Sequence, residues 1–385
     1  MKIVLFTHPP FLGSQSMPRF ANMLTEGMRA RGHTVEQWTA RKYFFGLPAP
    51  RSLKKWLAYI DQFLLFPLAV KLRLRSQPTD TLYVFADQAL GPWVPLVAKL
   101  PHVIHCHDFL AQRSARGGFP ENPTSWSGQI YQAFIRWGYS KGRNFISVSE
   151  NTRRDLHEFL GKSPDFSHVV YNGLNQSFAP AADPITTRKA LSEKLGLDLA
   201  SGFLLHVGGN LWYKNRPGVL HLYHAWRALP ATSPLPVLMI GEAPSPEMLD
   251  LQANSPFKAE IHFIQAADDA TLRLAYQAAS VFLFPSLEEG FGWPIAEAMA
   301  SGCPVVTTDR PPMTEVAGGA ASLIPVSGPP RDWAPKAARA LEQLLTLSPQ
   351  ERQERIINGI SNAERFRAGL CLDEVERLYA AALNS

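Results

Sequence analysis

The sequence predicts two consecutive α/β domains, each built on a doubly wound parallel sheet of the Rossmann-like kind. Three observations favour this fold class: short apolar runs alternate with helical patterns, two such series follow one another, and a Pro-, Ala- and Asp-rich segment separates them. The chain has 385 residues, which suits two domains of fewer than about 200 residues better than a single core. Because ligands of such sheets bind at the carboxyl ends of the strands, we expect the two domains to face each other across a cleft.

The first series opens with a buried strand at residues 2–7, which the turn-forming residues from Pro9 to Gly13 end. A helical pattern follows over residues 18–31, and a second strand is expected at 34–38. This order of strand, tight loop, helix and strand is the opening of a parallel βαβ unit. Further apolar runs complete an N-terminal Rossmann-like domain at residues 1–180. They lie at 81–85, 102–106, 144–148 and 168–171.

The segment Ala179–Thr187 has the composition of a linker, and a second series of strands follows it. We assign residues 181–360 to a C-terminal Rossmann-like domain, and residues 361–385 to a C-terminal helix that packs back on the first domain. The apolar runs of this second domain lie at 203–207, 236–240, 260–264, 280–284, 304–307 and 321–324.

The composition narrows the class of protein. Hydrophobic residues make up 46% and charged residues 18%, which is typical of a globular chain. The three cysteines are widely spaced and form no metal-ligand or disulfide pattern, which favours a reducing compartment. We expect neither a signal peptide nor a transmembrane span, and hence a cytoplasmic location, with peripheral contact with the inner face of the membrane left open.

The charge is unevenly distributed along the chain. Residues 1–180 carry 21 Lys and Arg against 11 Asp and Glu, a net charge of +10, whereas the remainder carries 17 against 22, a net charge of −5. A basic half has nucleic acid or an anionic membrane as candidate partners. We expect no nucleic acid, because the basic residues lack interleaved aromatic platforms outside residues 56–66.

The most informative stretch runs from Glu289 to Glu297, after the strand at 280–284. Its glycines, among them Gly292, allow the backbone to approach a ligand, and Pro294 fits the first turn of a helix. The helix would then point free N–H groups and the positive end of its dipole at a diphosphate. Glu297 lies about one turn inside, where a carboxylate can accept two hydrogen bonds from a ribose diol. An ordinary capped helix with an acidic surface residue is the alternative.

This stretch resembles the E-x7-E signature of glycosyltransferase family 4, a retaining group with the GT-B fold. Residues 300–306 and 312–318 also look like that family, and the resemblance extends over nearly the whole chain. It implies that Glu297 binds the nucleotide ribose, that Glu289 lies at the donor sugar, and that Phe291 and Gly292 flank the phosphates. It further implies a nucleotide-sugar donor, UDP- or GDP-linked, and a glycan or lipid-linked acceptor, as in the synthesis of cell-surface polysaccharides or glycolipids.

A second phosphate-binding element is predicted at residues 206–215, where glycines follow a strand and Lys214 comes soon after. A cation on a flexible stem beside a glycine turn suits the charge of a leaving diphosphate. In the family pattern an Arg and a Lys five residues apart reach the diphosphate; Lys214 matches the Lys, but Gly209 stands where the Arg is expected. Arg216 and Asn210 are the candidates for compensation, and a solvated loop lysine is the alternative for Lys214.

Two sites are expected on the acceptor side. His107 ends the strand at 102–106, and the family carries a similar His near the donor sugar hydroxyls and the reacting centre; a satisfied structural histidine is the alternative. We expect the side chains of His105 and His107 to point to opposite faces of the strand, which does not suit a shared metal ion. The loop around Gly13 resembles the family's N-terminal glycine loop near the donor phosphate, with Ser14 in place of its second glycine.

No Asp-x-Asp pair occurs in the sequence, although enzymes that hold a diphosphate through a divalent cation usually need one. We therefore predict no metal site and no cofactor beyond the donor substrate, and assign catalytic roles to His107, Lys214 and Glu289. Two alternatives stay open: a GT-B epimerase or phosphorylase, and a binding subunit that has lost turnover. The absence of the expected Arg at Gly209 favours the second of these.

Residues 51–75 have basic ends around an aromatic and apolar middle. Six cations flank a single internal acid, Asp61, and Pro67 is expected to kink the segment. This pattern suits a helix that lies in a membrane interface, and the middle is too short to span a bilayer. The alternative is a core helix of the first domain with solvated ends.

Overall fold

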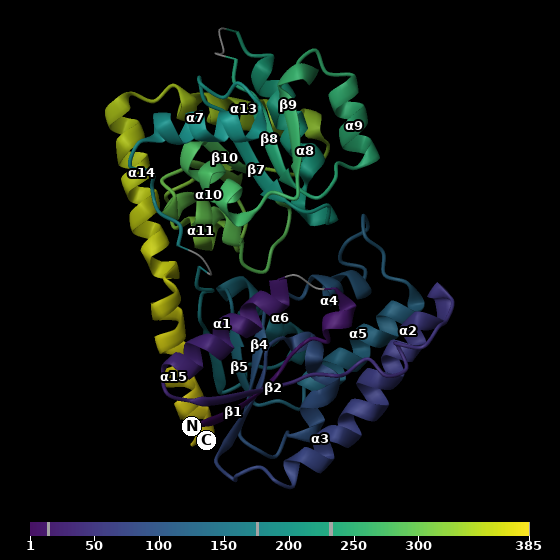
Figure 1. Ribbon diagram of the computed structural model, residues 1–385. Helices are drawn as coiled ribbons and strands as arrows, with labels where there is room; N and C mark the ends of the chain where they lie inside the picture. Colours follow the sequence, from purple (N-terminus) through teal and green to yellow (C-terminus); the bar gives the residue numbers. More distant parts are fainter. Residues whose placement is uncertain (14–15, 175–176, 231–233, 385) are drawn as a thin grey trace. The chain divides into compact units, whose positions relative to one another are not determined.

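The computed structural model describes residues 1–13, 16–174, 177–230 and 234–384. The chain forms two compact units, one of Met1–Asn175 with Ala368–Ser385 and the other of Gln176–Arg367. Within the described residues, each unit holds one parallel six-stranded sheet with helices packed on it (Figure 1). The predicted fold class, two Rossmann-like α/β units, is therefore confirmed.

The elements of the first unit follow the predicted order. Its strands are β1 (Lys2–Phe6), β2 (Thr34–Trp38), β3 (Thr81–Phe85), β4 (His102–Cys106), β5 (Asn144–Ser147) and β6 (Phe166–Val169). Its helices are α1 (Ser16–Ala30), α2 (Arg51–Ile60), α3 (Phe66–Leu74), α4 (Leu110–Ala115), α5 (Trp126–Tyr139), α6 (Glu150–Leu160) and α15 (Ala368–Leu383). The short turns η1 (Pro10–Leu12), η2 (Asp61–Leu65) and η3 (Gln88–Leu96) lie between them.

The strand order of the first sheet is β2-β1-β3-β4-β5-β6. β1 pairs in parallel with β2 and with β3, so that Ile3 lies opposite both Val35 and Leu82. The chain thus leaves β1 toward one edge of the sheet and returns to build the other edge from β3 onward. This reversal between β1 and β3 is the topological switch point, where the connections leave a crevice at the carboxyl ends of the strands.

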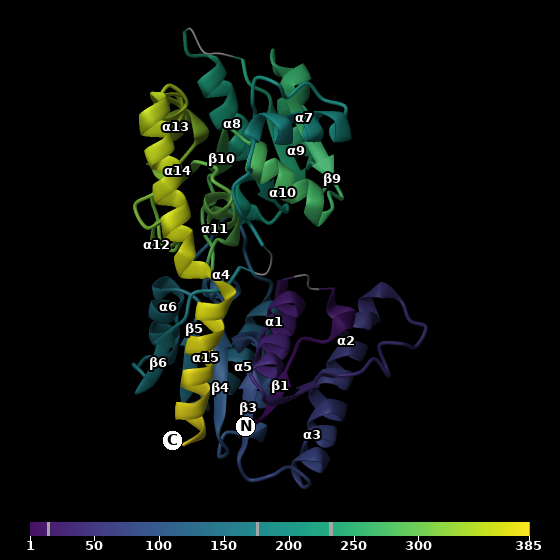
Figure 2. The same ribbon diagram turned by 60° about the vertical axis from the view of Figure 1, so that its left-hand side comes forward.

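The core of the first unit is apolar and largely aromatic, because strands buried on both faces tolerate few polar side chains. Phe6 and Phe85 stack with ring centroids 4.6 Å apart, and Trp93 and Phe66 pack beside them. The C-terminal helix α15 contacts α1, β3 and β4 and runs along this sheet (Figure 2). Residues 368–385 therefore belong to the first unit.

The second unit repeats the architecture. Its strands are β7 (Leu204–Gly208), β8 (Val237–Gly241), β9 (Ile261–Gln265), β10 (Val281–Phe284), β11 (Val305–Thr308) and β12 (Ser322–Ile324). Its helices are α7 (Pro184–Leu195), α8 (Arg216–Arg227), α9 (Pro246–Ala253), α10 (Asp269–Ala278), α11 (Trp293–Ala300), α12 (Met313–Ala317), α13 (Pro330–Leu345) and α14 (Pro349–Ala363), with the short turns η4 (Trp212–Lys214), η5 (Lys258–Glu260) and η6 (Glu364–Phe366).

The second sheet has the order β12-β11-β10-β7-β8-β9. β7 pairs in parallel with β10, with Leu204 opposite Val281. From β7 the chain builds one edge through β8 and β9, and from β10 it builds the other through β11 and β12. The switch point of this unit therefore lies between β7 and β10, and the loops that follow these two strands meet there.

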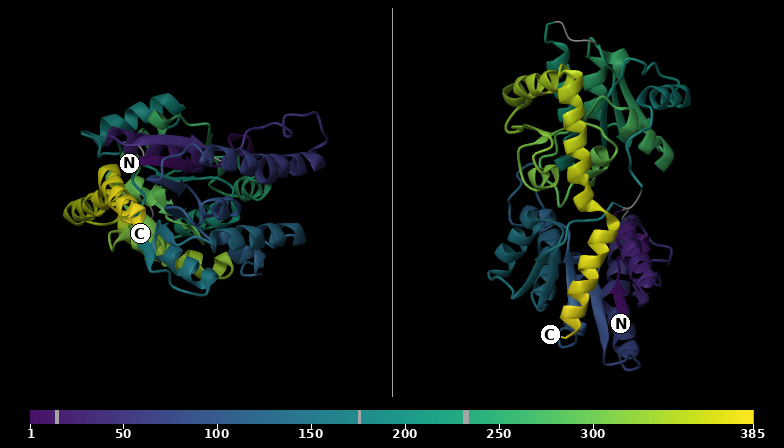
Figure 3. Two further views of the ribbon diagram at one scale, coloured as in Figure 1. Left: turned by 90° about the horizontal axis from the view of Figure 1, so that it is seen from below. Right: turned by 90° about the vertical axis from the view of Figure 1, so that its left-hand side faces the viewer.

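Two local expectations need correction. The linker expected at 179–187 ends earlier than predicted, because Asp183 caps α7 by accepting a hydrogen bond from the Ile185 N–H and Pro184 begins the helix. The second expectation concerns Pro67, which was expected to kink the segment 51–75. The irregularity lies just before Pro67, where the π-helical turn η2 joins α2 to α3, because proline lacks the N–H that a regular helix would need there. α2, η2 and α3 form one rod at the edge of the first unit (Figure 3).

None of the helices that the structure describes is both long and apolar enough to pass through a bilayer. The three cysteines are free and buried.

Candidate functional site

The loops after β7 and β10 are tied together at the switch point of the second unit. The Leu287 N–H donates to the Tyr213 carbonyl at 2.7 Å, and the Asn215 side chain donates to the Pro285 carbonyl at 2.9 Å. Asn215 has a left-handed backbone with φ 49°, which Asn adopts more readily than most residues, and it ends η4 where α8 begins. The two loops therefore act as one structural element.

Lys214 and Glu289 form an ion pair across this switch point. The Lys214 Nζ donates to both carboxylate oxygens of Glu289, at 2.7 and 2.8 Å. The side chain of Lys214 is 18% exposed and that of Glu289 only 7%. The two predicted catalytic residues of this unit, 75 positions apart in the sequence, are thus in direct contact. The carboxylate of Glu289 thus balances the positive charge of Lys214 beside the glycine loop, where both side chains are largely buried.

The start of α11 and Lys214 both lie close to the ring of Phe284. Gly292 precedes the helix with φ 106°, a left-handed backbone that favours glycine, and Pro294 occupies the first turn. A Cβ on Gly292 would lie 3.9 Å from the Phe284 ring, and the Lys214 Nζ lies 5.5 Å from the centroid of that ring. The predicted helix start and Lys214 therefore both border Phe284.

Glu297 and Phe291 lie on either side of this helix start. Glu297 is half-buried on α11, and the Tyr276 hydroxyl donates to its Oε2 at 2.9 Å. Burial, and to a smaller extent the charge of Glu297, raise the pKa of Tyr276 well above its usual range. The hydroxyl therefore keeps its proton and remains a donor. The Phe291 ring is buried and packs edge-on against Phe366 at 5.4 Å. Only the backbone of Phe291 therefore remains for the predicted phosphate contact.

Gly209, the position of the missing Arg, faces a carboxylate. A Cβ on Gly209 would lie 3.1 Å from the Glu242 Oε1, and the Asn210 N–H donates to the Glu242 Oε2 at 2.8 Å. Arg216 donates to the Asn210 side chain and to the Glu242 carbonyl, and only 2% of it is exposed. Arg216 thus braces the loop from inside and does not present its charge at the surface, where a compensating cation would be needed.

In the first unit, His107 lies at the carboxyl end of β4 and is 7% exposed. The ring Nε2 of His107 lies 2.9 Å from the Ala86 carbonyl oxygen. The backbone N–H of His107 donates to the Gln88 Oε1 at 2.9 Å. Burial lowers the pKa of His107, although Asp87 opposes this shift. Because a carbonyl oxygen can only accept, Nε2 carries the proton of the neutral ring and Nδ1 is left as an acceptor.

The expected orientation of His105 is wrong. Residues two positions apart on a strand share a face, and the rings of His105 and His107 both contact Phe20, with centroids 5.2 and 4.4 Å away. His105 bonds to the Tyr379 hydroxyl of α15 at 2.6 Å, and burial lowers its pKa to about 3. Its role is thus structural. Within the described residues, no three His, Cys, Asp or Glu side chains gather in a way that could hold a metal ion.

A polar pair that the sequence reasoning missed spans the switch point of the first unit. His8 follows β1, Asp87 follows β3, and the His8 Nε2 lies 2.9 Å from the Asp87 Oδ2. Burial alone would raise the pKa of Asp87, but the hydrogen bond and charge of His8 outweigh it, and the pKa is lowered. Both residues directly follow predicted strands, so the rule that polar residues at strand ends line a site could have found them.

Gly13 ends η1 with φ 74°, and among the described residues no atom beyond its chain neighbours would lie within 4 Å of a Cβ at this position. The left-handed backbone accounts for a glycine at this position. Ser14, predicted to replace the second glycine of this loop, lies outside the described residues.

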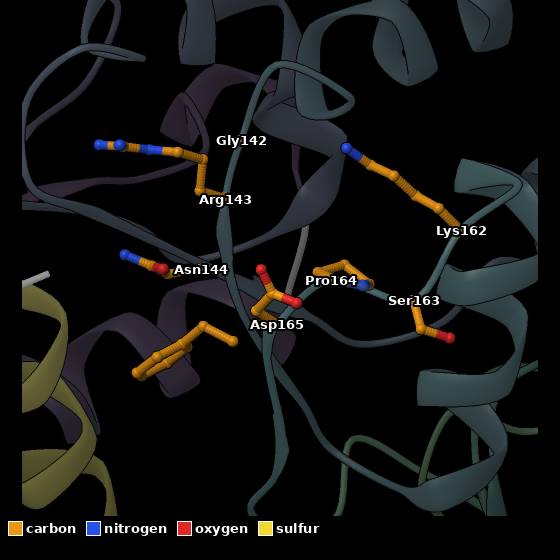
Figure 4. A pocket seen from close by; sticks show the side chains of 8 residues that line it. Gly142, Arg143, Asn144, Lys162, Ser163, Pro164 and Asp165 are labelled. Carbon is orange, nitrogen blue, oxygen red and sulfur yellow. The ribbon is translucent and has the colours of Figure 1, made fainter.

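A hollow of about 490 Å³ lies at the opposite end of the first sheet, where β5 and β6 begin. Arg143 and Lys162 flank it, and Asp165 lies between them (Figure 4). Because it is at the amino ends of the strands, this hollow is separate from His107, Asp87 and His8.

Known proteins share sequence and fold with this chain. Two family models match the chain: "Glycosyltransferase Family 4" over residues 17–178, and "Glycosyl transferases group 1" over residues 202–346. The D-inositol 3-phosphate glycosyltransferase of Corynebacterium aurimucosum is 31% identical over 62% of this chain and 56% of its own length. The O-antigen chain mannosyltransferase RfbU of Salmonella typhimurium is 23% identical over 50% of each chain. The chain thus spans about half the length of these curated relatives.

Solved structures show the same fold at low sequence identity. Sucrose-phosphate synthase from Thermosynechococcus elongatus superposes with a TM-score of 0.71 at 16% identity, over 99% of this chain and 98% of its own. Anabaena HepE in complex with UDP-glucose gives a TM-score of 0.71 at 15% identity, over 99% and 100%. The fold is GT-B, and with both family models matched the chain belongs to glycosyltransferase family 4, the group 1 glycosyl transferases.

Proposed function

We propose that the chain transfers a hexosyl group, with retention of configuration, from a UDP- or GDP-linked sugar to a glycan or lipid-linked acceptor, without a metal ion. The observation that carries this proposal is the Lys214–Glu289 pair at the switch point of the second unit, beside the start of α11. The relative named as an O-antigen chain mannosyltransferase supports a glycan acceptor.

The donor diphosphate is expected beside Lys214 and the first turn of α11. As the bond between the sugar and the diphosphate breaks, negative charge grows on the diphosphate and positive charge on the sugar. Lys214 and the helix dipole stabilise the former. Lys214 gives up one of its two contacts with Glu289 and forms a contact with the phosphate instead. The Glu289 carboxylate can then accept a hydrogen bond from a hydroxyl of the donor sugar.

The ribose diol is expected at Glu297, which Tyr276 holds in place through one carboxylate oxygen. The loop of Gly209 and Asn210 borders the diphosphate with backbone groups. The charge lost with the missing Arg is not supplied by Arg216, which is buried. We therefore expect Lys214 to carry a larger share of diphosphate binding than in relatives that have both cations.

The first unit supplies the acceptor side of the reaction, through His107 and the loop of Gly13. A neutral His107 with a bare Nδ1 suits a hydrogen bond from a sugar hydroxyl, because burial keeps the ring uncharged. We place the protein at the inner face of the membrane, with residues 51–75 as its contact.

The test is a panel of UDP- and GDP-linked sugars incubated with the purified chain and candidate acceptors. Transfer product with the same anomeric configuration as the donor supports the proposal. Isomerised donor without transfer would indicate an epimerase, phosphorolysis of a glycan would indicate a phosphorylase, and binding without nucleotide release would indicate an inactive binding subunit.

Metal independence has its own test, because the fold permits either chemistry. We expect transfer to continue at an unchanged rate after dialysis against a chelator. Loss of transfer that Mg²⁺ or Mn²⁺ restores would contradict this part of the proposal and leave the transferase assignment intact.

A further inference from the structure

The first unit carries two rows of exposed apolar side chains on neighbouring helices. One row follows the rod of α2, η2 and α3 and consists of Leu53, Trp56, Leu64, Leu68 and Leu72. The other follows α5 and consists of Trp126, Ile130, Phe134 and Trp137, which recur at helical spacing on one side of that helix. Trp126 is 76% exposed and Trp56 59%. Clustered exposed apolar side chains usually mark an interaction site.

A ladder of contacting aromatic rings joins the two rows. Trp56 contacts Tyr59 at 5.8 Å between ring centroids, and Tyr59 stacks on Tyr131 of α5 at 5.5 Å. Phe63 contacts Tyr131 at 6.0 Å and Phe134 at 5.5 Å, and Phe134 stacks on Trp137 at 5.8 Å. α2 and α5 are accordingly neighbours (Figure 1). The two rows therefore form one surface, which we call the aromatic face.

The described parts of residues 51–75 and 126–143, which build the aromatic face, carry cations and no exposed carboxylate. Asp61 is the single acid in residues 51–75 and 126–143, and it is 1% exposed. Its carboxylate accepts hydrogen bonds from three backbone N–H groups, those of Tyr43, Phe44 and Phe45, at 3.1, 2.9 and 2.9 Å. The exposed cations of these segments include Lys55, Lys71, Arg75 and Lys141. Other cations have partners elsewhere: Lys54 donates to the Phe45 and Leu47 carbonyls, and Arg73 lies over Trp38.

Two of the cations lie over rings of the ladder itself. The Lys55 Nζ is 5.6 Å from the centroid of Tyr59, and the Lys141 Nζ is 5.9 Å from that of Trp137. The basic groups therefore border the aromatic rings at both ends of the surface, on α2 and at the end of α5. This combination of Trp and Tyr rings with Lys at their edge matches the headgroup region of a bilayer that contains anionic lipid.

We propose that α5 and the rod of α2, η2 and α3 together form a bilayer-docking surface, which inserts Trp56, Trp126 and Trp137 among anionic lipid headgroups. A second copy of the chain fits this surface less well, because its cations would lie against cations. The inference extends the membrane contact of residues 51–75 and rests on the proposed function for its use, but vesicle binding needs neither donor nor acceptor.

The experiment is co-sedimentation of the full chain with vesicles of phosphatidylglycerol and phosphatidylcholine, and with phosphatidylcholine alone. We expect binding to the anionic vesicles that weakens at high salt, and little binding to the neutral ones. The double variant Trp126→Ser/Trp137→Ser on α5 is expected to lower the partition coefficient at least tenfold, and Trp56→Ser severalfold. The matched control is Ile185→Ser, whose side chain is equally exposed at 76% but lies on α7 of the second unit.

Three outcomes would overturn the inference: equal binding of the wild type to neutral and anionic vesicles, unchanged binding of the α5 double variant, or dimers of the wild type that the α5 variant abolishes without any vesicle binding. Thermal unfolding of each variant checks that the fold persists. Transfer to a water-soluble acceptor, measured on the same variants, is expected to stay at the wild-type rate. A failure of docking is thereby separated from a failure of the transferase proposal.

Discussion

The switch points of the two units are bridged by different polar pairs. In the second unit, Lys214 and Glu289 meet through two short contacts between a cation and a carboxylate. In the first unit, His8 and Asp87 meet through one contact, beside a neutral His107. The same sheet topology thus positions polar groups at equivalent places, while the choice of side chain sets the charge that each place offers. The second switch point thus offers a paired cation and the first a neutral imidazole, as the proposed donor and acceptor roles require.

The largest effect is expected from breaking the charged pair. Lys214→Gln should lower kcat by roughly 10²- to 10³-fold, the loss typical when one group that stabilises transition-state charge is removed. Transfer at saturating donor measures this effect. The control is Lys194→Gln in the same unit, whose ion pair with Asp268 is exposed and should be worth little. Turnover of Lys214→Gln within threefold of the wild type would contradict the assigned role.

The same variant separates catalysis from stability. Removing Lys214 leaves the buried Glu289 carboxylate unpaired, and breaking such a pair costs up to about 3–5 kcal/mol of unfolding free energy. The double variant Lys214→Gln/Glu289→Gln should therefore regain stability in urea unfolding without regaining turnover. Recovery of turnover along with stability would show that Lys214 acts only through the fold.

A smaller effect is expected at the ribose site. Glu297→Gln should raise the donor KM about tenfold, because hydrogen bonds to a charged acceptor are roughly twice as strong as those to a neutral one. Its kcat should change little. Steady-state kinetics with varied donor concentration distinguish the two parameters, and an unchanged KM would place the ribose elsewhere.

Tyr276→Phe should raise the donor KM severalfold, since it removes one hydrogen bond of about 1 kcal/mol that orients Glu297. Tyr223→Phe is the matched control: Tyr223 is buried in the same unit, but its hydroxyl bonds to Leu235, Glu260 and Arg227, which have no predicted role in donor binding. Equal effects of the two substitutions on KM would indicate that Tyr276 contributes only to packing.

At the first switch point the expected effect is on stability. Asp87→Asn keeps the acceptor for the Ala89 N–H but loses the carboxylate partner of His8, at a cost of roughly 1–3 kcal/mol. The folded-state pKa of Asp87 is lowered, so its contribution is present above the unfolded value of about 3.9 and is lost as the pH falls through the folded pKa. Urea unfolding should therefore show a gap between wild type and variant at pH 7 that narrows toward pH 3, whereas a constant gap would argue against this pair.

The smallest effect is a shift in titration. Because burial lowers the pKa of His107, its ring should take up a second proton only at a lower pH than a free imidazole does, and the neutral ring should carry its proton on Nε2. Nitrogen-15 NMR of the histidine rings would report this tautomer directly. A protonation step of His107 near pH 6.5 would show that the ring is more solvated than the structure indicates.

Much of the fold could be predicted because its signals are local. The strands at 81–85 and 102–106 have the expected bounds, since a strand buried on both faces gives a short, mainly apolar run between turns. The edge strand at 34–38 also has its expected bounds, although only Val35 and Trp38 in it are buried. The start of α11 was predicted from Gly292 and Pro294 alone, because a left-handed residue and a first-turn proline act within a few positions of the chain. The start of α7 was missed, although Asp183 and Pro184 carry a similar signal.

The sequence by itself determined which residues are chemically able to act: Lys214, Glu289, Glu297 and His107 were all named from residue type and position after a strand. Only the tertiary structure decided their partners, because sheet order brings together residues that are far apart in the chain. It paired Lys214 with Glu289, His8 with Asp87 and Tyr276 with Glu297, and it enclosed Arg216. It also brought α5 beside α2 through the contact of Tyr131 with Tyr59, since a helical period shows which residues share a face but not which other helix lies beside it.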